Sequence, residues 1–170
     1  MKNIVLVGFM GTGKTAAAKL IASDLELEYV SIDALIAGKE KTDIKSIFSD
    51  KGEPYFRDLE KSIVKEISNK NGQVIDTGGG IVIDPENVIM LKKNGIVICL
   101  WASPGVVHKR TKHSEARPLL NVSDPEMRIK ELLDSRREYY ERADFHINTD
   151  ELDAKSVADA IREIFNEEKN

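Results

Sequence analysis

Eight residues near the amino terminus have the types and spacing of a phosphate-binding loop. Residues 8–15 read Gly-Phe-Met-Gly-Thr-Gly-Lys-Thr, which matches the pattern G-x-x-x-x-G-K-[ST]. Glycines at these positions let consecutive backbone N–H groups curl around phosphate oxygens, and the following helix points the positive end of its dipole at the anion. In this pattern Lys14 reaches the β- and γ-phosphates and the Thr15 hydroxyl ligates Mg²⁺. The loop therefore predicts a nucleotide-phosphate site rather than a glycine-rich turn that binds nothing.

Charged residues outside this loop are candidates for binding the acceptor of a phosphoryl group. Asp33 follows an apolar run, at the carboxyl edge where open α/β sheets bind ligands. The alternative is that Asp33 caps a helix from Ala34 onward. Arg57 and Glu60 stand three residues apart on one face of a predicted helix, and there the alternative is a surface ion pair. Taken alone, each pattern leaves its alternative open.

Glycines and arginines later in the chain extend this set. Residues 77–80 read Thr-Gly-Gly-Gly, and three consecutive glycines cost enough backbone entropy that a close approach to the backbone is expected there. Residues 117–120 read Arg-Pro-Leu-Leu, with Arg110 before them and Arg136 after them. The planar fork of arginine suits carboxylates and phosphates. For Arg136 and the adjacent Arg137, an ordinary solvated helix face is the alternative.

The elements that must position these residues alternate between two hydrophobic periods. Short apolar runs, typical of strands buried on both faces, cover residues 4–7, 29–32, 74–75, 96–100 and 145–147. Helical patterns or helix-start signals lie at residues 14–25 and 54–67, at Asp84-Pro85, Ser103-Pro104 and Ser123-Asp124-Pro125, and behind a capping Asp153. The alternation predicts one three-layer α/β/α domain over residues 1–170, with a five-stranded parallel sheet. Residues 112–122 lack clear periodicity and are predicted to form a mobile lid.

Composition excludes several classes of protein. The chain has 170 residues, 41% hydrophobic and 32% charged, which is typical of a folded globular domain rather than a disordered one. A single cysteine, Cys99, excludes a disulfide framework and a cysteine-based zinc site. The net charge of −4 argues against a general nucleic-acid binder. No apolar run approaches the roughly 20 residues of a membrane helix, and the amino terminus is expected to be a first strand rather than a signal peptide.

Taken together, these motifs resemble one family, the shikimate kinases. The resemblance extends from the first strand to the last helix and rests on the P-loop, on Asp33 and on G-E-x-x-F-R-x-x-E at residues 52–60. It also includes T-G-G-G at residues 77–80, R-P-L-L at residues 117–120, and the pair Arg136 and Tyr140. The resemblance implies the nucleoside monophosphate kinase-like fold of P-loop NTPases. It further implies transfer of a phosphoryl group from Mg·ATP to the 3-hydroxyl of shikimate, in the cytoplasmic synthesis of aromatic amino acids.

The resemblance also implies roles for individual residues. Lys14, Asp33 and Arg117 would be catalytic, Asp33 beside the reacting hydroxyl and Arg117 moving with the lid onto the ATP phosphates. Substrate-binding helices would span about residues 33–61. The nucleotide-binding residues would be Gly11, Thr12, Gly13, Lys14, Thr15, Ala16, Arg110 and Arg117. The shikimate-binding residues would be Asp33, Arg57, Gly78, Gly79, Gly80 and Arg136, with both Arg57 and Arg136 on the carboxylate.

Two departures from the family pattern stand out. The family shows D-x-D at the end of the second strand, whereas residues 31–33 here read Ser-Ile-Asp. The missing carboxylate belongs to the magnesium shell, and we hypothesise that Asp76, at the end of the third strand run, supplies the lost charge. Ser31 or Asp76 would then stand in the outer shell of the ion. The alternative is that Asp76 hydrogen-bonds a nearby turn. Residues 151–154 read Glu-Leu-Asp-Ala where many members carry arginine and proline near the adenine.

Three functions stay open at this point. The first is a shikimate kinase that uses Mg²⁺, with ATP and shikimate as its small-molecule partners, acting as a monomer without nucleic acid or membrane. The second is another kinase on the same scaffold, of the gluconate or nucleotide type. The third is a catalytically weak, shikimate kinase-like protein that binds nucleotide, for which Ser31 is the main support.

Overall fold

The structure is a computed structural model, and it describes residues 1–112, 120 and 122–168. Five parallel strands form one sheet in the order β2-β3-β1-β4-β5. The strands are β1 (Asn3–Val7), β2 (Glu28–Ser31), β3 (Gln73–Asp76), β4 (Gly95–Trp101) and β5 (Phe145–Asn148). The predicted α/β fold with a five-stranded parallel sheet is confirmed.

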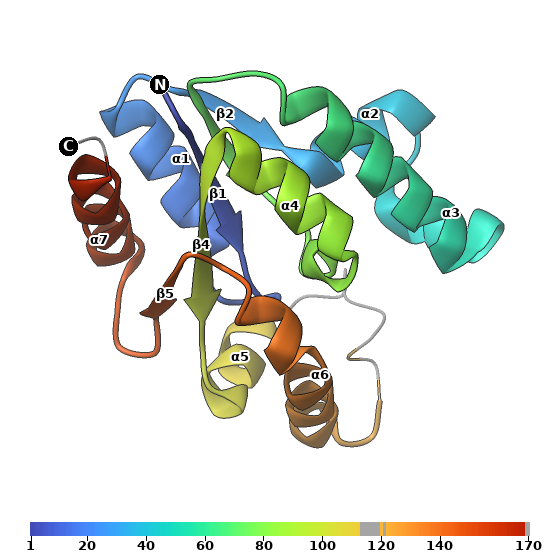
Figure 1. Ribbon diagram of the computed structural model, residues 1–170. Helices are drawn as coiled ribbons and strands as arrows, with labels where there is room; N and C mark the ends of the chain where they lie inside the picture. Colours follow the sequence, from blue (N-terminus) through green and yellow to red (C-terminus); the bar gives the residue numbers. More distant parts are fainter. Residues whose placement is uncertain (113–119, 121, 169–170) are drawn as a thin grey trace.

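Helices cover both faces of this sheet (Figure 1). Helix α1 (Lys14–Asp24) and helix α7 (Ala154–Glu167) lie side by side on one face. The other helices are α2 (Ile32–Glu40), α3 (Ile44–Ile67), α4 (Pro85–Lys93), α5 (Pro104–Thr111) and α6 (Pro125–Tyr140), with a short 3₁₀ turn η1 (Ile81–Ile83).

The two core layers follow from side-chain alternation along the strands. In β1, Ile4 and Leu6 pack with α1 and α7, whereas Val5 and Val7 pack into the layer that holds α3, α4 and α6. All four side chains are fully buried. Strands of this kind are apolar on both faces because helices cover both, and this explains why the runs were legible as strands in the sequence.

The helix starts predicted from the sequence are confirmed at their capping residues. The Asp84 carboxylate accepts from the Glu86 N–H at 2.9 Å, Asp124 from Met127 at 3.0 Å and Asp153 from Ser156 at 2.7 Å. At Asp33, however, the capping alternative is wrong. Helix α2 is capped two residues earlier by the Ser31 hydroxyl, which accepts from the Ala34 N–H at 3.2 Å. Asp33 therefore remains available to the cavity.

The resemblance implied substrate-binding helices over about residues 33–61, whereas the hydrophobic periodicity located only the helix at residues 54–67. Helix α2 and the first part of α3 occupy residues 32–40 and 44–51. Helix α3 is interrupted at Gly52, whose φ of 79° and ψ of 170° are not helical. The helix resumes at Pro54, which accords with its predicted place in a first helical turn. Among the described residues, no helix is long and apolar enough to cross a membrane.

Candidate active site

A cavity of about 700 Å³ lies beyond the carboxyl ends of β1, β2 and β3. Ligands bind at this edge in open parallel sheets, because loops and helix N-termini converge there. Most of the predicted site residues line the cavity: Gly11, Gly13, Lys14, Thr15, Ala16, Ser31, Asp33, Arg57, Asp76, Gly78, Gly79, Gly80, Arg110 and Arg136. One cavity thus joins the glycine-rich loop to the segments expected to bind the acceptor.

The loop after β1 has the backbone shape that phosphate binding requires. Gly13 precedes α1 with a φ of 94°, and a Cβ at Gly8 would overlap the Leu100 carbonyl oxygen. The Lys14 ammonium donates to the carbonyls of Gly8 and Phe9 at 2.9 and 3.0 Å, so it lies across the mouth of the loop. The N-terminus of α1 points into the same space and favours an anion there.

Thr12 differs from its neighbours in the loop. Its side chain is buried, and its hydroxyl donates to the Phe9 carbonyl at 2.8 Å. The Thr12 carbonyl in turn accepts from the Thr149 hydroxyl at 3.1 Å. The Thr12 side chain therefore stabilises the shape of the loop and does not open onto the cavity.

Asp76 ends β3 beside the first turn of α1. Its Oδ2 accepts from the Thr15 hydroxyl at 2.7 Å and from the Tyr29 hydroxyl at 3.1 Å. These partners are side chains of a helix and a neighbouring strand, so the alternative of a bond to a nearby turn does not hold. Burial and the adjacent Asp76 charge raise the pKa of Tyr29 to about 12, so Tyr29 stays protonated and donates.

Arg57 and Glu60 form a partly buried pair rather than the surface pair that was the alternative. Glu60 is 1% exposed, and one of its carboxylate oxygens accepts from Arg57 Nη1. The other edge of the guanidinium donates to Glu53 Oε1 through Nε at 3.3 Å and Nη2 at 3.0 Å. Burial raises the pKa of Glu60 to about 7, although the Arg57 charge opposes the shift, and the two acids keep Arg57 charged.

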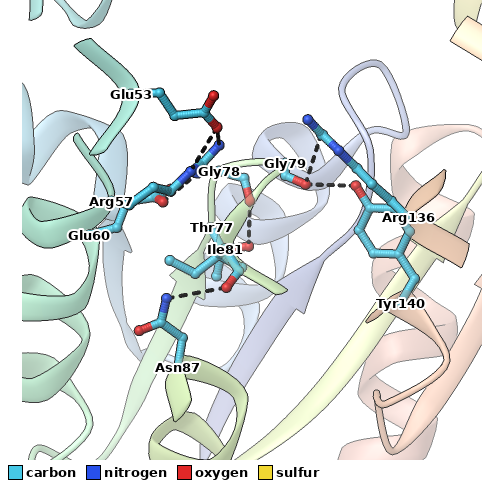
Figure 2. A network of polar contacts seen from close by, with 10 residues as sticks. All are labelled: Glu53, Arg57, Glu60, Thr77, Gly78, Gly79, Ile81, Asn87, Arg136 and Tyr140. Carbon is cyan, nitrogen blue, oxygen red and sulfur yellow. Dashed lines mark hydrogen bonds and ion pairs between the residues drawn. The ribbon is translucent and has the colours of Figure 1, made fainter. Parts of the chain in front are cut away.

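The glycine turn after β3 lies between the two arginines expected to bind a carboxylate (Figure 2). Arg57 comes from α3 on one side and Arg136 from α6 on the other. The Gly79 carbonyl accepts from the Tyr140 hydroxyl at 2.6 Å and from Arg136 Nη1 at 3.5 Å. The structure therefore brings Arg57, Arg136 and residues 78–80 together at one end of the cavity.

Asp33 lies between the two ends of this cavity. A Cβ added at Gly78 would stand 3.0 Å from its Oδ1, so Asp33 faces the glycine turn. Its surface opens into the cavity, but the surrounding walls dehydrate it. This dehydration, followed by the charge of Asp76, raises the pKa of Asp33, while Lys14 and Arg57 lower it. A carboxylate in this position can accept a proton or a hydroxyl hydrogen bond.

Arg110 lies at the opposite end, near the loop. It donates to the carbonyls of Gly11 and Thr149, at 3.3 and 2.6 Å. Within residues 151–154, where the sequence differs from the family pattern, Asp153 caps α7. Arg117 and most of the predicted lid at 112–122 lie outside the described residues.

Two parts of the cavity wall were missed by sequence reasoning. Phe48 and Phe56 form an apolar wall, with ring centroids 4.6 Å apart. The interruption of α3 at Gly52 lies between the two rings, so no single helical period in the sequence indicated their contact. Tyr29 also lines the cavity. Its signal was the two-residue spacing from Ser31, which places both side chains on one face of a strand.

Comparison with known proteins identifies close relatives. A family model described as "Shikimate kinase" matches residues 10–166. The shikimate kinase of Thermodesulfovibrio yellowstonii is 50% identical over 161 residues, which cover 95% of this chain and 93% of that protein. A solved structure of shikimate kinase from Acinetobacter baumannii in complex with shikimate is 34% identical with a TM-score of 0.94, covering 99% of this chain and 95% of that one. The shikimate kinase structure from Aquifex aeolicus is 30% identical with a TM-score of 0.82, covering 98% of each chain.

Proposed function

Because the chain belongs to the shikimate kinase family, we propose that it transfers the γ-phosphoryl group of Mg·ATP to the 3-hydroxyl of shikimate. The observation that carries this proposal is the shared cavity, which joins the phosphate-binding loop to Arg57, Arg136 and the glycine turn. We place the reaction in the synthesis of aromatic amino acids in the cytoplasm, carried out by a monomer whose single domain spans residues 1–170.

Shikimate fits the acceptor end by charge and by shape. Its carboxylate would bind between the guanidinium groups of Arg57 and Arg136, because arginine donates to carboxylates through a planar fork. Residues 78–80 carry no side chains, so the ring could approach their backbone closely. Phe48 and Phe56 would cover the apolar part of the ring. The acceptor is thereby oriented with its reacting hydroxyl toward Asp33.

In the reaction, the acceptor oxygen forms a bond to the γ-phosphorus as the bond to the β-phosphate oxygen breaks. Asp33 would orient the hydroxyl and accept its proton as the new bond forms. Lys14 would stabilise the charge on the phosphoryl oxygens, which dominates catalysis of phosphoryl transfer. We assign the same role to Arg117, which would arrive with the lid over residues 112–122 and help exclude water.

For nucleotide binding, we assign the backbone of residues 11–16 to the phosphates and Arg110 to the neighbourhood of the adenine. Gly11 and Gly13 both have positive φ values, 77° and 94°, which let successive N–H groups curve around one anion. Thr12 would contribute through its backbone alone, since its side chain is buried within the loop.

The residues at the phosphate end fit Mg²⁺. This ion prefers oxygen ligands and is usually held by one or two carboxylates together with substrate phosphates. Thr15 and Asp76 supply a hydroxyl and a carboxylate that are already 2.7 Å apart. The described residues contain no group of three or more His, Cys, Asp or Glu side chains that could hold a metal ion. Thr15 would therefore ligate the ion with the nucleotide phosphates, and Asp76 would stand in its outer shell.

Asp76 is a better candidate than Ser31 for that outer shell. The Ser31 hydroxyl is engaged in capping α2, and a hydroxyl carries no charge. Mg²⁺, when bound, would neutralise negative charge on the phosphates. A negatively charged oxygen close to Thr15 would attract the cation more strongly than a neutral hydroxyl would.

The test is ADP release by the purified protein with Mg·ATP, measured with shikimate, quinate or gluconate and without any acid. We expect strong stimulation by shikimate alone. Stimulation by gluconate alone would reassign the acceptor pocket. Binding of nucleotide without stimulation by any of these acids would favour a catalytically weak protein and contradict the proposed function.

A further inference from the structure

The Tyr29 hydroxyl donates to Asp76, and the reaction described above gives Tyr29 no role. We propose that Tyr29 is a positioning residue, which fixes the Asp76 carboxylate beside Thr15 so that this pair replaces the carboxylate missing at Ser31. The inference rests on the proposed function, since it concerns the divalent cation that accompanies the nucleotide phosphates. It adds to that function a residue, Tyr29, that no family motif quoted above contains.

The register of the sheet explains how the two positions became equivalent. Strands β2 and β3 are parallel neighbours, and Ser31 is paired with Asp76 at their carboxyl ends. A carboxylate on either strand would therefore reach the same edge of the sheet. The Asp76 oxygen is 2.7 Å from the Thr15 hydroxyl. The carboxylate that is missing at Ser31 on β2 is thus replaced by that of Asp76, the residue paired with Ser31 on β3.

Tyr29 is placed to hold that carboxylate. Residues 29 and 31 project from the same face of β2, because side chains alternate along a strand. On this face, Tyr29 packs with the apolar layer of α1, and its ring lies 5.7 Å from the ammonium of Lys19. The anchored ring carries its hydroxyl to 3.1 Å from Asp76 Oδ2, diagonally across the strand pair.

The chemistry of a phenol suits this task. A lysine or arginine partner would orient Asp76 but would also cancel its negative charge. A neutral hydroxyl donor fixes the carboxylate and leaves that charge available to a divalent cation. Tyr29 and Thr15 both donate to Oδ2, from two sides. Two donors on one oxygen restrict rotation of the Asp76 carboxylate, which in turn orients the proposed metal ligand Thr15.

The test measures cation binding without turnover. Mn²⁺, used as a paramagnetic substitute for Mg²⁺, is titrated into the protein saturated with ADP, and free Mn²⁺ is read by electron paramagnetic resonance. Tyr29→Phe keeps the ring and its contact with Lys19 but removes the hydroxyl. We expect it to weaken Mn²⁺ binding by about threefold, less than the roughly tenfold or more given by direct partners of metal ligands, because Asp76 itself stands in the outer shell. Asp76→Asn should weaken binding at least as much, and the double variant should match Asp76→Asn.

Tyr55→Phe is the matched control. The Tyr55 hydroxyl also donates to a carboxylate, that of Glu40 at 3.1 Å, and Tyr55 does not line the cavity. This variant should bind Mn²⁺ as the parent protein does. Unchanged Mn²⁺ binding in Tyr29→Phe would overturn the proposal, as would an equal loss in Tyr55→Phe. So would additive losses in the double variant, which would make Tyr29 and Asp76 independent.

A second measurement separates this proposal from the proposed function. In the ADP-release assay with shikimate, Tyr29→Phe should raise the Mg²⁺ concentration that gives half-maximal turnover by the same factor. The KM for shikimate should not change, because Tyr29 lies at the phosphate end. An increase in the shikimate KM alone would overturn the positioning role. If shikimate supports no turnover in the parent protein, the proposed function fails, and the Mn²⁺ titration still decides the role of Tyr29.

Discussion

The guanidinium group of Arg57 lies against the backbone of Gly80, with no room between them for a side chain. A Cβ built on Gly80 would stand 2.5 Å from both Nη1 and Nη2 of Arg57. The φ of Gly80 is −105°, which any residue can adopt, so backbone conformation does not require glycine here. The third glycine of the run is therefore required by the arginine rather than by the turn.

Gly80→Ala should consequently impair shikimate binding. The methyl group would displace a guanidinium that Glu53 and Glu60 hold on both sides, so the fork would no longer face the substrate carboxylate. We expect the KM for shikimate to rise by about tenfold or more, the loss of roughly one charge-assisted hydrogen bond. Steady-state kinetics would measure this. Gly38→Ala in α2 is the control, because its Cβ would meet nothing within 4 Å. An unchanged shikimate KM in Gly80→Ala would contradict the packing argument.

Arg57→Ala should separate the two substrates. In the proposed function the Arg57 guanidinium binds the shikimate carboxylate, so its removal should raise the KM for shikimate by about tenfold to hundredfold. The KM for ATP should change by less than about twofold, because the phosphates bind at the other end of the cavity. Initial rates with each substrate varied in turn test this. Equal increases in the KM for shikimate and the KM for ATP would contradict the placement of Arg57 at the acceptor end.

Lys14→Met should act mainly on kcat. The ammonium lies across the mouth of the loop, bonded to the carbonyls of Gly8 and Phe9, where phosphate oxygens would take over as partners. Loss of one preorganised donor to the transition state typically lowers kcat by about 10²- to 10³-fold. Shikimate binding by equilibrium dialysis should remain, which would show that the variant is folded. If Lys14→Met retained most of the parent kcat, the catalytic role proposed for Lys14 would be wrong.

The buried Glu60 should make stability depend on pH. Its pKa of about 7 in the folded protein exceeds the ordinary value of 4.5, so between these values the folded protein binds more protons than the unfolded chain. The free energy of unfolding should therefore fall as pH rises from about 4.5 through 7, by on the order of 3 kcal/mol from this group, and then level off.

Urea unfolding of the parent protein and Glu60→Gln at pH 5 and pH 8 would test that sign. The amide cannot titrate, so the variant does not lose this stability as pH rises. Relative to the parent protein, Glu60→Gln should therefore be more stable at pH 8 than at pH 5. Asp33, whose pKa is also raised, titrates in both proteins, and because its charge acts on Glu60 the comparison measures Glu60 together with this coupling. A difference that is the same at both pH values would contradict the assignment.

Much of the fold was predictable because its signals are local. The strand runs at residues 4–7 and 96–100 are apolar on both faces, and Asp84, Asp124 and Asp153 cap helices from adjacent positions. Helix α2 was harder to predict because it is short and begins directly after β2, with Ser31 acting as its cap.

The site was predictable as a set of residues but not as a set of contacts. The P-loop, Asp33, Arg57, residues 78–80 and Arg136 all reach one cavity. The burial of Glu60 was not legible, because a spacing of three residues suits a surface pair equally well. The bond between Tyr29 and Asp76 depends on strand register, which no local pattern specifies.

Phosphoryl transfer to the 3-hydroxyl of shikimate is tested most directly by identifying which oxygen of which acid receives the phosphoryl group. The protein would be incubated with Mg·ATP and shikimate, and the product examined by ³¹P–¹H correlation NMR. We predict a single phosphate monoester, with phosphorus coupled to the proton on C3 of the shikimate ring and formed in equal amount with ADP. A phosphate on another hydroxyl, or ADP formed without any shikimate ester, would contradict the central claim.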